Sequence, residues 1–135
     1  MKLLHREDVE EAGYDMPVTG LCANISEFDL EALKFAGEWV LADDENLVGD
    51  GQRQNYLYLV ITGEVGIYKN NDQGQSQHLA SLGPGEAFGE MAFLSGGVAS
   101  ADVQASAECI LWRLDHERLL EFIAENGAAG GQLCM

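Results

Sequence analysis

The chain has 135 residues, 23 of them acidic and 7 basic, and its formal net charge is −16. A length of this order suits one domain with a hydrophobic core of its own. The acidic excess opposes binding to nucleic acid and to anionic lipid, because both carry negative charge. No apolar run approaches the roughly 18 residues that a membrane span needs, and the N-terminus lacks the apolar core of a signal peptide. We therefore expect an acidic, soluble, cytoplasmic domain.

Residues 1–20 are predicted to be an arm or linker. Charged residues dominate positions 6–11, glycines and a proline follow between Gly13 and Gly20, and no apolar stripe accompanies them. A short helix over residues 7–12 would need a partner to dock on. The domain proper is expected at residues 21–127, followed by a tail at residues 128–135.

A helix is expected from Ser26, a typical N-cap, to Gly37, a typical helix stop. Apolar side chains recur at helical spacing between these two residues, and acidic residues occupy the first turn, where they suit the helix dipole. A brief strand at residues 39–41 then leads to an acidic bend at residues 43–45.

From Leu47 onward the pattern changes to short strands separated by turn residues. The run 56–61 is almost continuously apolar, as in a buried strand, whereas residues 65–69 alternate. Further strands are expected at residues 78–82, 103–106 and 109–114, with a hairpin loop at residues 70–74. Regularly spaced short strands predict an antiparallel sandwich or barrel.

Asp115 is expected to cap a last helix over residues 116–126, which Gly127 ends. The leucine, phenylalanine and isoleucine side chains of this helix share one apolar face. The tail at residues 128–135 is too short and too rich in glycine for another stable helix.

The stretch from Gly85 to Val103 contains the strongest functional signal. Glycines open it, a short apolar run follows, and Gly96-Gly97 then lets the backbone turn. A helical turn that begins at a glycine presents unpaired N–H groups, which form an anion site. Glu90, just inside this turn, adds a carboxylate acceptor at about the width of one sugar. Together these features predict a site for a sugar phosphate.

Residues 88–103, FGEMAFLSGGVASADV, resemble the phosphate-binding cassette of the cyclic nucleotide-binding domain family. The stretch 45–65 is similar to a second pattern of this family, which lies N-terminal to the cassette. In that pattern a loop that contains glycine is followed by a strand and then by a turn with another glycine. The resemblance covers roughly residues 25–126. It implies a mainly β fold, a jelly-roll-like antiparallel β-roll of about eight strands with short flanking helices. It also implies a regulatory or signalling module that binds cAMP or cGMP.

The resemblance places the ligand site at seven positions: Phe88, Gly89, Glu90, Met91, Ala92, Ala99 and Ser100. Glu90 would accept a hydrogen bond from a ribose hydroxyl, or else cap its own short helix. The amides of Met91 and Ala92 would cradle an anion, or else belong to a tight turn that the fold needs anyway. Ser100 would donate to the phosphate, or else lie at a strand edge.

Two positions depart from the family pattern. Ala99 stands where the family has an arginine, whose charge-assisted hydrogen bonds to the phosphate contribute roughly 1.5–3 kcal/mol. Asp102 stands where the family has Thr or Ser, and it would be costly beside a phosphate unless strand alternation turns it outward. Arg53 and Arg113 are the arginines near enough in sequence to replace the missing one, and both are interpreted as surface residues. The long helix that closes over the base in ligand-responsive members is also expected to be missing or vestigial here.

These departures predict weak or absent cAMP and cGMP binding. The alternative is a degenerate domain that serves as a protein-interaction or assembly module, with a basic partner or a homodimer formed through helix 116–126. Catalysis is not expected, because no nucleophile–base pair stands out. A metal site is not expected, since the spacing of the histidines and of the cysteines matches no metal motif. Cys109, in a strand-like run, is predicted to be a small core residue.

Overall fold

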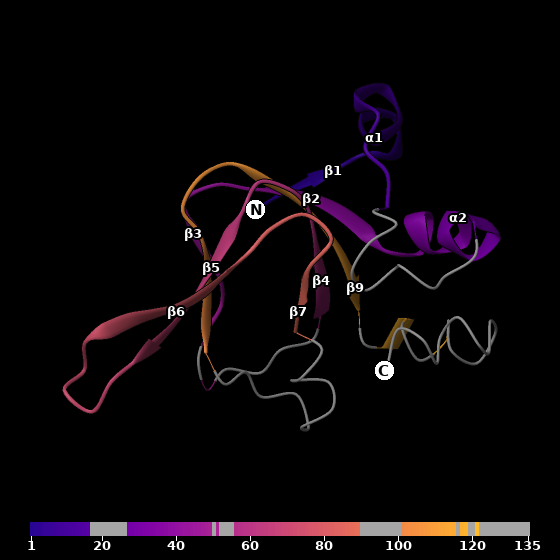
Figure 1. Ribbon diagram of the computed structural model, residues 1–135. Helices are drawn as coiled ribbons and strands as arrows, with labels where there is room; N and C mark the ends of the chain where they lie inside the picture. The colour runs from indigo at the N-terminus through magenta and orange to yellow at the C-terminus, as the bar shows by residue number, and fades with distance from the viewer. Residues whose placement is uncertain are drawn as a thin grey trace.

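The computed structural model describes residues 1–16, 27–49, 51, 56–89, 101–115, 117, 118 and 121 (Figure 1), with side chains from residue 31 onward in its longer helix. The elements in chain order are β1 (Lys2–Leu4), α1 (Arg6–Ala12), α2 (Glu27–Ala36), β2 (Glu38–Ala42), β3 (Glu45–Val48), β4 (Tyr56–Thr62), β5 (Val65–Asn70), β6 (Ser76–Leu82), β7 (Ala87–Phe88), β8 (Asp102–Ala105) and β9 (Cys109–Asp115).

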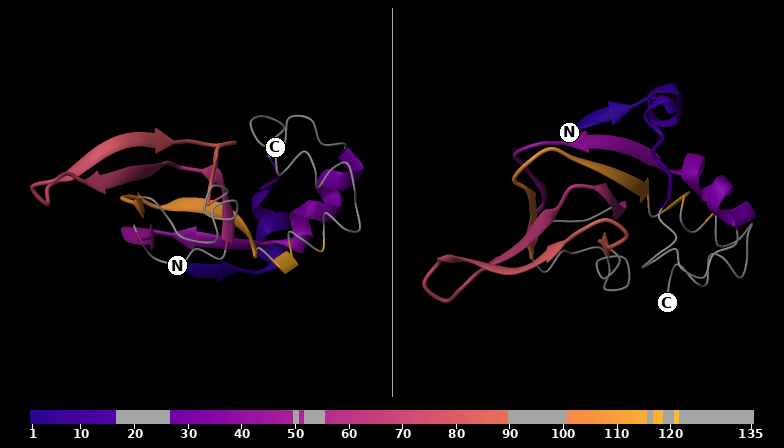
Figure 2. Two further views of the ribbon diagram at one scale, coloured as in Figure 1. Left: turned by 90° about the horizontal axis from the view of Figure 1, so that it is seen from below. Right: turned by 45° about the horizontal axis from the view of Figure 1, so that its top comes forward.

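The nine strands in this part of the chain form two sheets, which Figure 2 shows from two further directions. The five-stranded sheet has the order β1-β2-β9-β4-β7, and the four-stranded sheet has the order β3-β8-β5-β6. Every strand pair is antiparallel. The β5–β6 hairpin extends away from the remainder of the molecule (Figure 1). The expected mainly β, antiparallel architecture is confirmed.

An inner core of apolar side chains lies between the two sheets. The five-stranded sheet contributes residues from β2, β4, β7 and β9, and the other sheet contributes residues from β3, β5 and β8: Val40, Ala42, Tyr58, Val60, Phe88, Cys109 and Leu111 against Val48, Val65, Val103 and Ala105. Cys109 is 1% exposed, which confirms its predicted place in the core. β7, at the edge of the five-stranded sheet, contributes Phe88 to this core.

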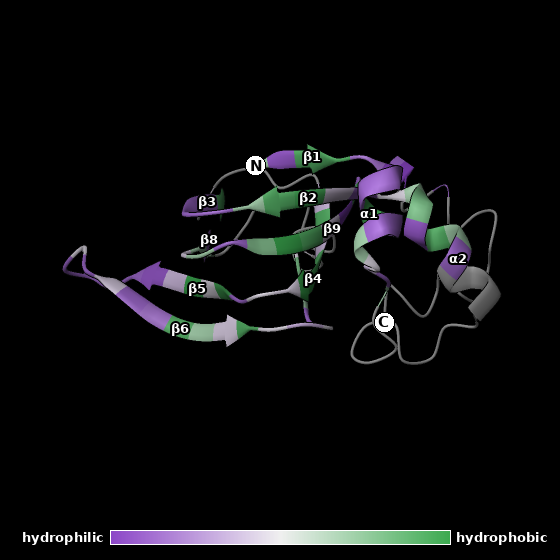
Figure 3. Ribbon diagram, turned by 90° about the horizontal axis from the view of Figure 1, so that it is seen from above, coloured by the Kyte–Doolittle hydropathy of each residue, from purple (hydrophilic) through white to green (hydrophobic). Residues whose placement is uncertain are grey.

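A second, outer core covers the opposite face of the five-stranded sheet. Three side chains pack there: Val9 of α1, Met16 of the segment after α1, and Leu33 of α2. They lie on side chains from β2, β4 and β9, namely Trp39, Leu57, Leu59, Ile110, Trp112 and Leu114. Successive residues of β4 and β9 therefore enter alternate cores, and both faces of these central strands are buried. Figure 3 shows the resulting concentration of apolar residues on β2, β4 and β9. Burial on both faces is the physical reason for the continuous apolar run at residues 56–61.

The first sixteen residues are joined to this core rather than separate from it. β1 pairs with β2 in the register Lys2↔Leu41 to Leu4↔Trp39. α1 nearly matches the short helix expected at residues 7–12, and its docking partner is the outer core, in which Val9 is fully buried. The guanidinium of Arg6 lies 4.0 Å from the centroid of the Phe35 ring on α2. The proposed boundary between residues 20 and 21 stays a prediction, because it lies outside the described residues.

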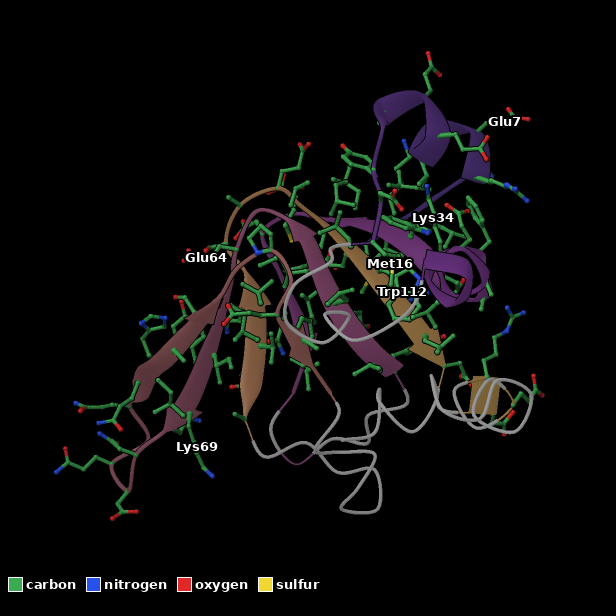
Figure 4. The ribbon with its side chains drawn as sticks, turned by 45° about the vertical axis from the view of Figure 1, so that its right-hand side comes forward. Glu7, Met16, Lys34, Glu64, Lys69 and Trp112 are labelled. Carbon is green, nitrogen blue, oxygen red and sulfur yellow. The ribbon has the colours of Figure 1, made fainter. Side chains whose placement is uncertain are left out.

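α2 confirms the predicted first long helix and leads through Gly37 directly into β2. The indole Nε1 of Trp39 donates to the Lys34 carbonyl at 2.8 Å, which ties the helix end to the strand that follows. Figure 4 shows Met16, Lys34 and Trp112 gathered where α2 meets the sheet, with Glu64 and Lys69 on the side of the hairpin.

The structure describes three residues of the last helix, Glu117, Arg118 and Glu121, and all three are helical. The rest of its expected extent, 116–126, lies outside the described residues and stays a prediction. The Glu117 amide donates to Oδ1 of Asp115 at 2.8 Å, which confirms Asp115 as the cap of this helix. Among the described helices, none has the length and apolar character required to cross a membrane.

Candidate functional site

The chain enters the predicted cassette through a loop that is anchored to β4. The Gly85 amide donates to the Val60 carbonyl at 2.9 Å, and the Val60 amide donates to the Glu86 carbonyl at 2.9 Å. The side chain of Glu86 accepts a hydrogen bond from the Gly83 amide at 2.7 Å, which closes the turn on itself. β7 then pairs with β4, with Leu59 opposite Ala87 and Tyr58 opposite Phe88. The start of the cassette is therefore fixed to a central strand of the fold.

Gly89 ends this anchored segment in a left-handed conformation, with a φ of 93°. A side chain is strained at such a φ, so the position requires glycine for backbone reasons alone. Of the seven predicted site residues, Phe88 and Gly89 are the two that the structure describes. Glu90, Met91, Ala92, Ala99 and Ser100 lie outside the described residues, as does Arg53, and their roles stay predictions.

Phe88 lies against Tyr58 of the neighbouring strand. The two rings stack with centroids 4.7 Å apart and planes 8° from parallel, and Phe88 is 6% exposed. Parallel stacking with this separation is a favourable aromatic geometry and adds about 0.5–1.5 kcal/mol beyond burial. Phe88 thus holds the cassette to the inner core, and direct contact of its side chain with a ligand remains a prediction.

Arg113 lies on the inner side of the five-stranded sheet near the end of β9, where it is partly buried, so its interpretation as a surface residue holds only in part. Its side chain is 20% exposed, and its Nε lies 3.3 Å from Oε1 of Glu38. The guanidinium also lies 4.4 Å from the centroid of the Tyr56 ring, and its Nη1 donates to Sδ of Met1 at 3.7 Å. Tyr58 stands opposite Arg113 in the pairing of β4 with β9. The sequence could name Arg113 but not its partners, because strand register, not composition, decides which side of β9 it occupies.

Burial and the Tyr58–Arg113 contact act on the pKa values of both residues. Burial raises the pKa of Tyr58, and its polar and charge interactions with Arg113 only partly oppose this effect. Burial alone would lower the pKa of Arg113, but its polar and charge interactions with Tyr58, followed by the charge of Glu38, outweigh this effect, so that this pKa is raised. Arg113 is therefore a fixed cation. The buried Nε contacts Glu38 as an ion pair without hydrogen-bond alignment.

A polar cavity of about 520 Å³ adjoins Arg113, where the ends of β2, β4 and β9 meet the last helix. Its lining includes the charged residues Glu38, Arg113, Asp115, Glu117, Arg118 and Glu121. Nη1 of Arg118 donates to the Ala36 carbonyl at 2.9 Å, so the last helix contacts the end of α2. Within the described lining, Arg113 pairs with Glu38 and Arg118 binds the Ala36 carbonyl, so each arginine has a protein partner. Across the described residues, no group of histidine, cysteine and carboxylate side chains is arranged to hold a metal ion.

Asp102 lies on the outward-facing side of β8. Val103 and Ala105 of the same strand are 6% and 1% exposed and belong to the inner core. Strand alternation therefore places Asp102 on the opposite side, with Gln104. In the pairing of β5 with β8, Asp102 stands opposite Tyr68. Of the two orientations considered from the sequence, the outward one is observed.

Comparisons with known proteins agree with this geometry. The family model for the cyclic nucleotide-binding domain matches residues 38–126. The cyclic AMP receptor protein of Thermus thermophilus is 42% identical over 79 residues, which cover 54% of this chain and 37% of that protein. A cAMP-dependent protein kinase regulatory subunit of Yarrowia lipolytica is 34% identical over 71 residues, covering 53% of this chain and 18% of that protein. The match thus spans less than two fifths of each of these relatives.

Solved structures give the same result for the fold. The Thermus thermophilus catabolite activator protein superposes with a TM-score of 0.78 at 28% identity, covering 85% of this chain and 55% of that one. A cyclic nucleotide-binding domain from Methylobacillus flagellatus superposes with a TM-score of 0.77 at 25% identity, covering 98% of this chain and 77% of that one.

Proposed function

Because the chain belongs to the cyclic nucleotide-binding domain family, we propose that it is a regulatory, non-catalytic module with low affinity for cAMP or cGMP. The observation that carries this proposal is the anchoring of β7 to β4, which delivers Gly89 in a left-handed conformation at the start of the cassette. Glu90 and the amides that follow it would then hold the ribose and the phosphate. The cytoplasmic location and the lack of nucleic-acid binding stay predictions from composition.

The low affinity follows mainly from Ala99. An arginine at this position would contribute roughly 1.5–3 kcal/mol through charge-assisted hydrogen bonds to the phosphate, equivalent to about a 10- to 100-fold change in Kd. Asp102 lies on the side of β8 that faces away from the inner core. We therefore expect its carboxylate to repel a bound phosphate less than it would from the inner side. Arg113 does not replace the missing arginine, because its guanidinium already pairs with Glu38 and lies over the Tyr56 ring.

A protein-interaction module is the second candidate, and the net charge of −16 supports it. The charged cavity beside the last helix contains four carboxylates against two arginines that already have partners. Such a surface would favour a basic partner. Homodimer formation through helix 116–126 is a further form of this candidate.

Isothermal titration with cAMP and with cGMP, up to millimolar nucleotide, tests the proposal. We expect weak saturable heat from the unmodified chain and its loss in Glu90→Ala. Glu64→Ala is the matched control, because Glu64 is an exposed glutamate in the turn between β4 and β5 and should leave binding unchanged. No heat at millimolar nucleotide would overturn ligand binding and favour the interaction module.

A further inference from the structure

Four residues form one row across the inner face of the five-stranded sheet. Glu38 of β2 stands opposite Arg113 of β9, Arg113 stands opposite Tyr58 of β4, and Tyr58 stands opposite Phe88 of β7. Residues directly opposite each other in antiparallel strands have side chains on the same face and in contact range. The row therefore crosses four adjacent strands without a gap and ends on the first residue of the cassette.

Each link of the row is a contact between neighbouring strands. An ion pair at 3.3 Å joins Glu38 to Arg113, the strand register places the side chains of Arg113 and Tyr58 opposite each other, and parallel ring stacking joins Tyr58 to Phe88. Tyr56, two residues before Tyr58 on the same face of β4, supports the guanidinium from the side at 4.4 Å. The other members of the inner core are apolar, and apolar contacts leave side chains more freedom of orientation.

The Glu38–Arg113 pair is only partly buried, with side chains 41% and 20% exposed. An ion pair in contact with water is a weak source of stability, because hydration competes with the attraction between the charges. A row of apolar residues would fill the same space at least as stably. The charged row is better explained by the geometry it imposes, since a guanidinium held on three sides fixes the Tyr58 ring, and this ring fixes Phe88.

The other end of the row lies where two helices meet. Glu38 follows directly after Gly37 and the end of α2, and Arg118 of the last helix donates to the Ala36 carbonyl one residue earlier. Glu38, Arg113 and Arg118 line the same cavity. One end of the row thus holds the cassette, and the other end touches the junction of α2 with the last helix.

We infer that Arg113 and Tyr58 are positioning residues, which set the placement of Phe88 and Gly89 and couple it to the junction of α2 with the last helix. The effect on ligand affinity rests on the proposed function, whereas the placement of the cassette does not. Arg113 acts through Tyr58 and touches no ligand itself.

Hydrogen exchange of the ligand-free protein tests the placement. Arg113→Met keeps the length of the side chain but removes the charge that pairs with Glu38 and faces Tyr58, and Tyr58→Phe keeps the ring stack but removes the hydroxyl. Each should speed exchange of the amides of residues 85–89 about tenfold, as expected for loss of a polar contact with a charged group. Exchange in the β5–β6 hairpin should stay unchanged, whereas a merely structural role would raise exchange throughout the fold.

Arg6→Met is the matched control, because Arg6 has the same kinds of partner but lies outside the row. It pairs with Glu10 at 3.2 Å and lies over the Phe35 ring, yet it belongs to α1. We expect no change at residues 85–89 in this variant. Equal exchange at residues 85–89 in Arg113→Met, Tyr58→Phe and Arg6→Met would overturn the inference. Tyr58→Phe decides the matter if Arg113→Met fails to fold.

Titration with cAMP adds a readout that separates the two proposals. If the unmodified chain binds, Arg113→Met and Tyr58→Phe should weaken binding several-fold, while Arg6→Met leaves it unchanged; unchanged binding in all three would overturn the link to affinity. Absence of binding in the unmodified chain would overturn the proposed function alone, and the exchange data would still decide the placement.

Discussion

Gly37 and Trp112 approach each other so closely that no side chain fits between them. A Cβ atom at Gly37 would lie 2.6 Å from Nε1 of Trp112 and 2.6 Å from the backbone oxygen of Arg113. Trp112 is fully buried in the outer core and Gly37 joins α2 to β2. Because Gly37 has no side chain, the end of α2 can approach the sheet directly beside Glu38 and Arg113, the first two residues of the row.

Gly37→Ala should destabilise the fold by about 1–3 kcal/mol, the usual cost of overpacking in a close-packed interior. The clash with a backbone oxygen cannot be relieved by a rotamer change. Urea denaturation measures the loss as a lower midpoint. Gly83→Ala is the matched control, since no atom outside its own neighbours lies within 4 Å of a Cβ there. An equal midpoint for both variants would contradict this packing.

Val9→Ala should lower the free energy of unfolding by about 1.5–3 kcal/mol, because Val9 is fully buried in the outer core. Leu3→Ala, at a side chain 50% exposed in β1, should change it by no more than about 0.5 kcal/mol. Thermal or urea unfolding of both variants makes the comparison. A neutral Val9→Ala would mean that the N-terminal segment adds nothing to the stability of the core.

The central strands and α2 were predictable because their own residues carry the pattern. The apolar run at residues 56–61 reflects burial on both faces of β4, and helical spacing of apolar residues marks α2. β1 was not predictable, because three residues with no apolar stripe become a strand only through pairing with β2. Long-range pairing overrides local preference there.

The site was predictable to a smaller extent. The glycine at position 89 could be anticipated from the family motif, and its positive φ gives the physical reason. The row of Glu38, Arg113 and Tyr58 could not, because the register of β2, β9 and β4 places them together and no local sequence signal reports a register across distant strands. A charged residue within the apolar strand 109–115 was the one available hint.

Stability should fall as the pH rises above about 9, partly through Cys109. Burial, followed by the charges of Glu45 and Asp43, raises the pKa of its thiol above the ordinary value of 9.0. The folded state thus holds the thiol proton more tightly than the unfolded state does. The contribution is full below pH 9 and is lost as the pH rises through the folded-state pKa.

Urea denaturation of the unmodified chain and of Cys109→Ala between about pH 6 and pH 10.5 checks this sign. The variant should be less stable at neutral pH through a small cavity, but its stability should fall less steeply above pH 9. Below about pH 8 the two curves should run parallel, because the thiol is protonated in both states there. Parallel curves over the whole range would contradict a raised pKa at Cys109.

Ala99→Arg should strengthen cAMP binding by about 10- to 100-fold, because it supplies the charge-assisted hydrogen bonds that the cassette lacks. Ala99→Lys should give a smaller gain, since an ammonium group cannot form the paired contacts of a guanidinium. Ala80→Arg, on the exposed strand β6, controls for the added positive charge and should leave affinity almost unchanged. Isothermal titration of the three variants measures the differences. An equal small gain in all three would indicate charge alone, and no gain in any would favour the interaction module, because the cassette would then lack the geometry that an arginine needs.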